Sequence, residues 1–430
     1  MGANEQLTIA EKLRKIRERK GVIQSSLADA LYCDVSRISE IERGKKEYTD
    51  EQITTLRTLL DIEDVPLTEA EMKKFRKRFY VWRDLIRERR IAEAKELHCE
   101  LSVISKLPFE EELNLMYKMF EASQRLRQDD AADNLSAIKE MLDECEPLIE
   151  KAPEEIKHYF YCNKGFYSIF IGDNKESVKY YSIAINTKDG GYDKEPAAYY
   201  NLGLGYTNLG NAVRAISILL KAYNLFDHKR TTMFGLAINN TLATNYIRTN
   251  QVELALKVLY ETLDKASELS DKAYLDITLH NIGCTYLQSG EYEKSVQYFD
   301  SAFLHIEKSN DLYLENFYAK IHTLIVAKNK SLYFPLLLKA KRLAQGSDHY
   351  TLLFESLSHL LTLKKAESIE FIEGKTMPYL LGEHDYYKAL NFCDVLYADH
   401  IKNNRGKKAS DITTLKVDIL AKILFGGDSK

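Results

Sequence analysis

The chain has 430 residues, too many for one compact domain, and a formal net charge of -4. Hydrophobic residues make up 45% and charged residues 29%, which favours a well-packed chain and excludes a disordered one. The sequence has no run of about 18 uncharged apolar residues and no apolar core of a signal peptide, so we expect no membrane partner. Its six cysteines are scattered and form no CxxC pair. These features predict a reduced, cytoplasmic protein without a metal site or another cofactor.

The first part of the chain predicts a set of short helices. Apolar spacing places them at 9–20, from residue 24, from residue 35 to Gly44, and at 51–60. Asp34 is expected to cap the third helix. Two short helices joined by a turn of three or four residues form a helix-turn-helix, whose second helix can enter the major groove of DNA. Residues 1–90 carry a net charge of +3, whereas residues 91–430 carry -7.

The stretch "QSSLADALYCDVSRISEIERGKK" closely resembles the DNA-binding domain of the Cro/C1-type (XRE) repressors. The resemblance is carried by Gln24, Leu27, Ala28, Ile38, Ile41, Glu42, Arg43 and Gly44. It departs from the family at Tyr32, where the family usually has glycine, and this puts the turn geometry in doubt. The resemblance implies double-stranded operator DNA as a partner, read by a domain at 1–66. The alternative is a small helical bundle whose charged face is only solvated.

Two groups of residues are then expected to contact DNA. By the resemblance, four face the bases: Val35, Ser36, Arg37 and Glu40. Five hold phosphates, which sets register rather than specificity: Gln24, Ser25, Arg43, Lys45 and Lys46.

A connector helix is predicted at 67–90, which includes "KKFRKRFYVWRDLIRERR". Phe75, Phe79, Trp82 and Ile86 make one side apolar, and the other side is strongly basic. We favour docking of this helix onto the next domain, because arginine also packs its stem at helix–helix contacts. The alternative is additional contact with phosphates beside an operator.

The central part of the chain repeats itself every 40 residues, which marks stacked units. The repeated positions include Leu202, Leu242 and Ile282; Tyr206, Tyr246 and Tyr286; and Gly210, Asn250 and Gly290. The last three fall where a left-handed residue would end the first helix of a pair. Small residues would let the paired helices approach closely, namely Gly203, Ala243 and Gly283 on the first helix and Ala215, Ala255 and Ser295 on the second.

These positions resemble the tetratricopeptide repeat, although its usual period is about 34 residues. We therefore predict an all-α protein in which a right-handed α-solenoid of about nine helix pairs, at 91–408, follows the helix-turn-helix. A capping helix and tail are expected at 409–430, with Ile412, Leu415, Ile419 and Ile423 on one stripe.

A helix-turn-helix fused to such repeats resembles the RRNPP family of peptide-pheromone receptors, closest to its NprR branch. The resemblance implies a transcription regulator whose concave face binds a short signalling peptide. The alternative is a Rap-like protein that binds a response regulator, alone or as a second activity, and a third possibility is a pure scaffold. We expect no enzyme, because the chain has no Walker A, G-x-S-x-G or HExxH motif. A homodimer is expected on DNA, because related folds bind two half-sites.

The first helices of the pairs are rich in asparagine, whose amide can both donate to and accept from the backbone of an extended peptide. The candidates are Asn163, Asn201, Asn240, Asn245 and Asn281, with Tyr200 and Gln288 as walls. Arg248, one turn beyond Asn245, could pair with an acidic group of the peptide. The alternative is that some of these asparagines, Asn201 and Asn281 above all, only cap or bridge helices. His280 and Cys284 are four residues apart, which without further ligands we interpret as chance or groove lining.

Overall fold

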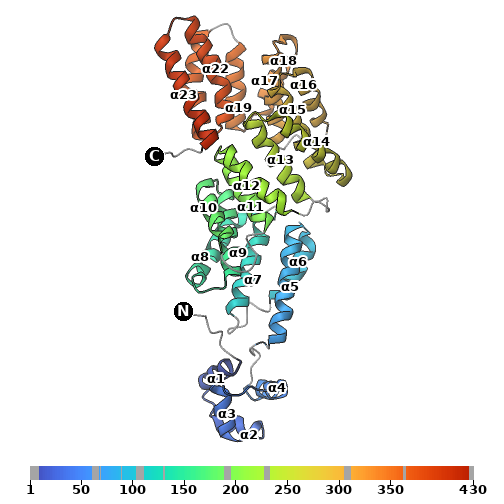
Figure 1. Ribbon diagram of the computed structural model, residues 1–430, viewed down its shortest axis with the longest axis vertical. Helices are drawn as coiled ribbons and strands as arrows, with labels where there is room; N and C mark the ends of the chain where they lie inside the picture. The colour runs from blue at the N-terminus through green and yellow to red at the C-terminus, as the bar shows by residue number, and fades with distance from the viewer. Residues whose placement is uncertain are drawn as a thin grey trace. The chain divides into compact units, whose positions relative to one another are not determined.

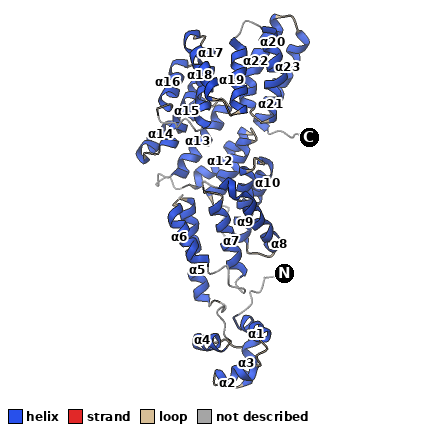
Figure 2. Cartoon of the chain, turned by 180° about the vertical axis from the view of Figure 1, so that it is seen from behind, coloured by secondary structure: helices blue, strands red, loops and turns tan. Residues whose placement is uncertain are grey.

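The computed structural model describes residues 9–60, 67, 69–88, 90–102, 111–128, 131–187, 195–226, 233–304, 311–361 and 365–425. Within these residues the secondary structure is helical and no strand occurs, which confirms the all-α class (Figures 1 and 2). The chain divides into two compact units, residues 1–170 with 186–192, and residues 171–185 with 193–430.

The helices of the first unit include the four predicted at the front of the chain. They are α1 (Ile9–Arg19), α2 (Gln24–Ala30), α3 (Val35–Glu42), α4 (Asp50–Leu59), α5 (Glu69–Arg87), α6 (Ile91–Leu101), α7 (Glu111–Arg125), α8 (Leu135–Ile149) and α9 (Glu154–Phe170).

The second unit holds the remaining helices. They are α10 (Asn174–Ile185), α11 (Pro196–Asn208), α12 (Ala212–Leu225), α13 (Met233–Arg248), α14 (Val252–Leu269), α15 (Lys272–Gln288), α16 (Tyr292–Ala302), α17 (Asp311–Val326), α18 (Lys330–Leu343), α19 (Asp348–Leu361), α20 (Lys365–Phe371), α21 (Met377–Gly382), α22 (Tyr386–Lys402) and α23 (Gly406–Phe425). One π-helical turn, Ile372–Thr376, joins α20 to α21.

Helices α1 to α4 enclose a small apolar core of their own, which includes Leu13, Leu27, Ile38 and Leu56. Glycines with positive φ angles follow α1 and α3, as the stop signals predicted. Asp34 does stand at the N-cap of α3, but its side chain makes no capping hydrogen bond. A complete capping box forms instead at α4, where the Thr49 hydroxyl accepts from the Gln52 backbone and the Gln52 side chain accepts from the Thr49 backbone.

Tyr32 lies in the turn between α2 and α3 with φ of +48°. Its side chain is 97% exposed. A residue with a Cβ atom is strained in this left-handed region, which explains why glycine suits the position better. The departure at Tyr32 therefore adds strain to the turn between α2 and α3.

Helix α5 docks on its neighbours through the apolar side that the sequence predicted. Phe79 and Trp82 are fully buried, and the Trp82 Nε1 donates to Gln124 Oε1 on α7 at 2.7 Å. Part of the basic side is also used within the unit, since the Arg83 Nη1 donates to the Tyr159 hydroxyl at 3.1 Å. These contacts favour docking over additional DNA contact for this helix.

From α5 onward the described helices succeed one another as nine pairs, α5/α6 to α22/α23, with α20 and α21 together forming one member. The repeat positions do what their spacing predicts. Gly210, Asn250 and Gly290 have φ of +75°, +57° and +80° and end the first helices of their pairs. A Cβ atom on Gly203 would lie 2.6 Å from Leu219 Cγ, and one on Gly283 would lie 2.6 Å from Phe299 Cε1. The pairs therefore pack at a distance that only small residues allow.

The last helices of the second unit return to its first pairs. A Cβ atom on Gly210, in the α11–α12 turn, would lie 2.6 Å from the ring of Tyr386 at the start of α22. The Tyr387 hydroxyl donates to Gln288 Oε1 at the end of α15. On α23, Ile419 and Ile423 are buried in the same core as Tyr386, as the predicted stripe requires. The unit is thus closed on itself.

Candidate functional sites

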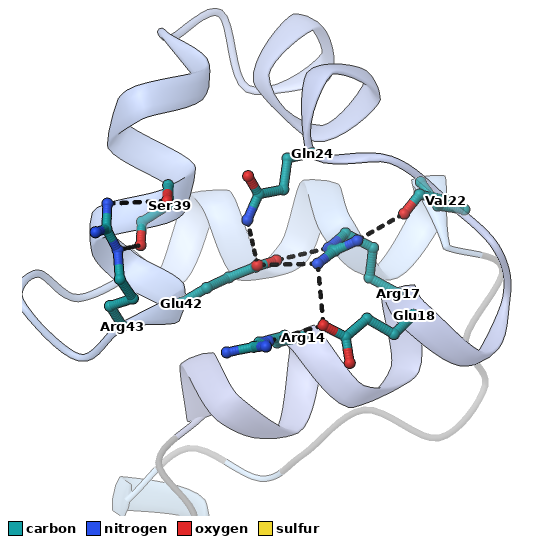
Figure 3. A network of polar contacts seen from close by, with 8 residues as sticks. All are labelled: Arg14, Arg17, Glu18, Val22, Gln24, Ser39, Glu42 and Arg43. Carbon is teal, nitrogen blue, oxygen red and sulfur yellow. Dashed lines mark hydrogen bonds and ion pairs between the residues drawn. The ribbon is translucent and has the colours of Figure 1, made fainter.

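Helix α3 is held in place by a buried carboxylate. The guanidinium of Arg17, on α1, binds both oxygens of Glu42, with Nε–Oε1 at 2.6 Å and Nη2–Oε2 at 2.9 Å (Figure 3). The Gln24 side chain, at the start of α2, donates to Glu42 Oε2 at 2.6 Å, and Arg17 also donates to the carbonyl oxygen of Val22. The hydrogen bond to Glu42 raises the pKa of Arg17. One carboxylate therefore fixes three helices of the motif relative to one another.

The first turn of α3 presents the residues predicted to face bases. Val35, Ser36 and Arg37 are exposed, while Ile38 behind them is fully buried. The backbone N–H of Arg37 donates to the Asp34 carbonyl, but its side chain makes no hydrogen bond or ion pair with any described residue, so the guanidinium is available to a ligand. A donor on an exposed helix turn suits the base edges of a major groove.

Some of the remaining residues predicted to contact DNA form bonds within the domain. Glu40 pairs with Lys46 at 2.7 Å, and this pair holds the pKa of Glu40 below its ordinary value. Arg43 binds the carbonyl and hydroxyl oxygens of Ser39, at 2.9 and 3.0 Å. Lys45 is exposed and Ser25 is half-buried. Gln24 was predicted to hold a phosphate, but its amide donates to Glu42 as described above.

On α13 and α15, two of the first helices of the pairs, which we call inner helices, two residues predicted to contact a peptide bond to each other. The Asn281 side chain donates to Asn240 Oδ1 at 3.1 Å. Asn240 in turn donates to Thr278 Oγ1 at 3.0 Å and to the Leu236 carbonyl at 3.1 Å. These bonds bridge α13 to α15. Bridging was the alternative considered for Asn281, and it extends to Asn240.

Asn245 differs from these residues because its side-chain oxygen accepts no hydrogen bond from a described residue. Its side chain is fully buried, and its Nδ2 donates to Thr207 Oγ1 and to the Thr241 carbonyl, both at 2.8 Å. Its Oδ1 is buried and has no hydrogen-bond partner among the described residues. A buried acceptor without a donor costs about 1–3 kcal/mol, so this oxygen favours a ligand that donates to it.

Arg248 lies one turn beyond Asn245. It is half-buried, and its Nη1 donates to the Thr207 carbonyl at 2.6 Å. Burial lowers the pKa of its guanidinium, and the charge of Asp385 opposes this effect. A partly desolvated cation beside an unsatisfied carbonyl offers recognition of both a carboxylate and a backbone N–H group.

The other predicted peptide contacts are distributed over both units. Tyr200 packs edge-to-face on Phe234, with ring centroids 5.4 Å apart, and Asn201 is buried. Gln288 accepts from Tyr387, as described above. Asn163 belongs to the first unit, where its amide donates to the Met119 carbonyl at 2.7 Å and accepts from Ser123 Oγ at 2.5 Å. Its side chain thus bridges α7 and α9.

The start of α22 lies close to Gln288 and Arg248, although no sequence pattern indicated this. Lys388 forms ion pairs with Asp385 at 2.8 Å and with Glu315, on α17, at 3.2 Å. Burial alone would raise the pKa of Asp385, but Lys388 holds it below its ordinary value. Because Tyr387 and Gln288 are separated by 99 residues in the chain, no local pattern could have predicted their contact.

Helix pairs stacked at this period, with small residues at their contacts, define a tetratricopeptide-like α-solenoid. The family model for the tetratricopeptide repeat matches residues 234–303. Over 182 residues the chain is 26% identical to the regulatory protein RapG of Bacillus subtilis (strain 168), a match that covers 41% of this chain and 49% of RapG. The chain thus spans about half the length of this curated relative.

Three solved structures share the fold. A Rap protein complexed with competence and sporulation factor has a TM-score of 0.66 at 16% identity, covering 82% of this chain and 99% of that chain. NprR in complex with its cognate peptide NprX has a TM-score of 0.61 at 18% identity, covering 83% and 99%. Aspartyl phosphate phosphatase F from Bacillus subtilis has a TM-score of 0.53 at 18% identity, covering 85% and 97%. These similarities establish the helical solenoid.

Two further findings concern the described residues alone. None of their helices is both long and apolar enough to cross a membrane. They also contain no group of three or more His, Cys, Asp or Glu side chains arranged to hold a metal ion.

Proposed function

We propose that this chain is a peptide-responsive transcription regulator of the RRNPP type, nearest its NprR branch. A short signalling peptide binds the inner helices of the second unit, and helices α2 and α3 bind operator DNA. The observation that carries the peptide site is the buried, unpartnered Oδ1 of Asn245 beside the half-buried cation Arg248. The likeness to NprR bound to NprX supports the same reading.

Asn245 and Arg248 contact the peptide directly in this proposal. Asn245 Oδ1 accepts a backbone N–H of the peptide, and Arg248 pairs with an acidic side chain or the terminal carboxylate. Asn240 and Asn281 position the site without contacting the peptide, because their amides hold α13 against α15.

Calorimetry with synthetic peptides tests this site. The peptides come from small secreted reading frames beside the gene, and each is titrated into the wild-type chain and into three variants. Asn245→Ala and Arg248→Ala should each weaken binding by at least about tenfold, since each removes a hydrogen bond to a buried or charged group. Asn163→Ala is the matched control, because this asparagine is also buried on an inner helix but uses its amide within the first unit. Wild-type affinity in the Asn245 and Arg248 variants would remove the site from this face.

The DNA-binding role rests on the exposed first turn of α3 and the buried pair that fixes its direction. Fluorescence anisotropy with a duplex from the upstream region should show binding that weakens steeply with salt. Exchanging Ser36 and Arg37 should change the preferred sequence, each lost base contact costing about 1–3 kcal/mol. A preference that stays the same in these variants would place base reading elsewhere. Two half-sites about 34 Å apart, or a multiple of this, would fit the proposed homodimer.

A second candidate function is binding of a response regulator, as in Rap-type proteins. The observation that favours it is the fold shared with aspartyl phosphate phosphatase F. Phosphorylated response regulators incubated with the chain would lose their phosphoryl group faster under this function. Salt-dependent binding of DNA would still be required for the first proposal, so the two can be separated or found together.

A further inference from the structure

The structure contains two pairs in which a histidine and a cysteine lie one helical turn apart on an inner helix. One pair belongs to the first unit and the other to the second. On α9 the Cys162 sulfur lies 3.6 Å from His158 Nε2, and on α15 the Cys284 sulfur lies 3.4 Å from His280 Nε2. In the second pair, the Asn316 side chain, on α17, reaches His280 Nδ1 at 2.9 Å. The two pairs are therefore an internal comparison of the same spacing in two environments.

The contacts of Asn316 fix which nitrogen of His280 carries the proton. The Asn316 Nδ2 donates to the Phe299 carbonyl at 2.8 Å, so its Oδ1 faces His280. An oxygen in that position accepts, and His280 Nδ1 must therefore be the protonated nitrogen. In the neutral ring Nε2 is then an acceptor, and it points at the sulfur of Cys284. A thiol, a histidine that accepts its proton and an amide that orients the histidine form the arrangement of an activated nucleophile.

The pKa values of the two pairs also differ. Burial alone would lower the pKa of His280, but Cys284, Glu315 and Asn316 together raise it to about 9. The raised pKa makes His280 a stronger base than an ordinary histidine. In the other pair, burial raises the pKa of Cys162 to about 12, which keeps that thiol protonated at neutral pH. Cys284 and Cys162 are both partly exposed, so exposure alone does not separate the two thiols.

We propose that Cys284 is a reactive thiol, activated by His280, that hydroperoxides oxidise reversibly. The thiol proton moves to His280 Nε2, and the sulfur attacks the distal oxygen of the hydroperoxide. The O–O bond breaks and an S–O bond forms, which gives the sulfenic acid. The leaving oxygen takes the proton from His280 and departs as water or an alcohol. Sulfur is oxidised by two electrons and the peroxide is reduced by two.

The reverse direction uses a second small molecule. A low-molecular-weight thiol attacks the sulfenic sulfur, and water leaves as a mixed disulfide forms; a further thiol then restores Cys284. A metal site is a poorer use of this pair, since among the described residues no third His, Cys, Asp or Glu completes a ligand group. The site goes beyond peptide and DNA binding, and its test needs neither ligand.

Labelling of sulfenic acid with dimedone after hydrogen peroxide, followed by mass spectrometry of each cysteine, tests the proposal in the intact chain. At neutral pH Cys284 should be labelled at least about tenfold faster than Cys162, and faster than Cys99, which is the more exposed thiol. His280→Gln should slow Cys284 by a similar factor and leave Cys99 unchanged. His158→Gln is the matched control and should leave Cys284 at its wild-type rate.

Two results would overturn the assignment. One is a wild-type order of labelling in which Cys99 or Cys162 reacts before Cys284. The other is an unchanged Cys284 rate in His280→Gln. If circular dichroism shows that His280→Gln does not fold, alkylation of the wild-type chain by iodoacetamide at pH 6 decides the matter. Only a thiol with a nearby base reacts quickly there, so slow reaction of Cys284 refutes the proposal.

Discussion

Removing the carboxylate of Glu42 should destabilise helix α3, the helix proposed to read DNA. In Glu42→Ala, the Arg17 guanidinium would remain buried without its bidentate partner, and the Gln24 amide would lose its acceptor (Figure 3). The side chains of Arg17 and Glu42 are only 10% and 2% exposed, so water replaces these bonds poorly. Breaking one side of such a buried pair costs about 3–5 kcal/mol. A domain of this size has little more stability than that in total.

Hydrogen exchange of the full-length chain measures the effect where it occurs. At about 1.4 kcal/mol per tenfold change, exchange of the α3 backbone should accelerate by roughly two to four orders of magnitude in Glu42→Ala. Glu18→Ala is the matched control, because Glu18 reaches the same Arg17 only at 3.5 Å and its closer pair, with Arg14, lies at the surface with side chains 47% and 49% exposed. Exchange in α22, in the other unit, should not change in either variant. Equal protection of α3 in the Glu42 and Glu18 variants would refute the reasoning.

Three other predictions follow from single sites. Tyr32→Gly should stabilise helices α1 to α4 by up to about 1 kcal/mol, because it removes the strain of a left-handed residue and the side chain that it removes is 97% exposed. Slower hydrogen exchange in α2 and α3 would show this, and faster exchange would contradict it. Alanine at Lys45 and Lys46 should weaken all DNA sequences alike and reduce the slope of log K against log[salt] by about 0.9 for each lost phosphate contact, whereas an unchanged slope would exclude such contacts. Burial lowers the pKa of His322 to about 4, so the folded chain resists a proton that the unfolded chain takes up near pH 6.5. Stability should therefore fall as the pH drops from about 6.5 towards 4, by about 2 kcal/mol at pH 5, and His322→Leu should lack this component in denaturant titrations at pH 7 and pH 5.

Much of the architecture could be predicted because it depends on local chemistry. The close packing of small residues and the left-handed turn depend only on contacts within one helix pair. The structure has both where the 40-residue pattern predicted them, with the left-handed turns at Gly210, Asn250 and Gly290. The ends of α1 to α4 follow from stop and cap signals in the same way. The missing capping bond at Asp34 shows the limit, since an N-cap residue type does not fix its rotamer.

The candidate sites were harder to predict because one residue type serves two purposes. Asparagine on an inner helix can bind a peptide or bridge a neighbouring helix, and both uses need a buried amide. Sequence position therefore could not distinguish Asn240 from Asn245. The side-chain amide of Asn240 forms hydrogen bonds with α15, whereas the side-chain oxygen of Asn245 has no donor among the described residues. Likewise, Gln24 fits a phosphate contact by its place in the motif, and only the fold reveals that Glu42 lies within reach of its side chain.

The closure of the second unit bears on which peptides the proposed site would accept. Gln288 already accepts a hydrogen bond from Tyr387, and the charge of Arg248 is partly balanced by Asp385. A peptide that uses these two residues must replace the start of α22 there or bind alongside it. Replacement is favourable only for a ligand that returns an equivalent donor to Gln288 and an equivalent anion to Arg248, because burying either without a partner is costly. If the proposed site binds a peptide, that peptide should carry a carboxylate and a nearby hydrogen-bond donor, and a purely apolar peptide should bind weakly.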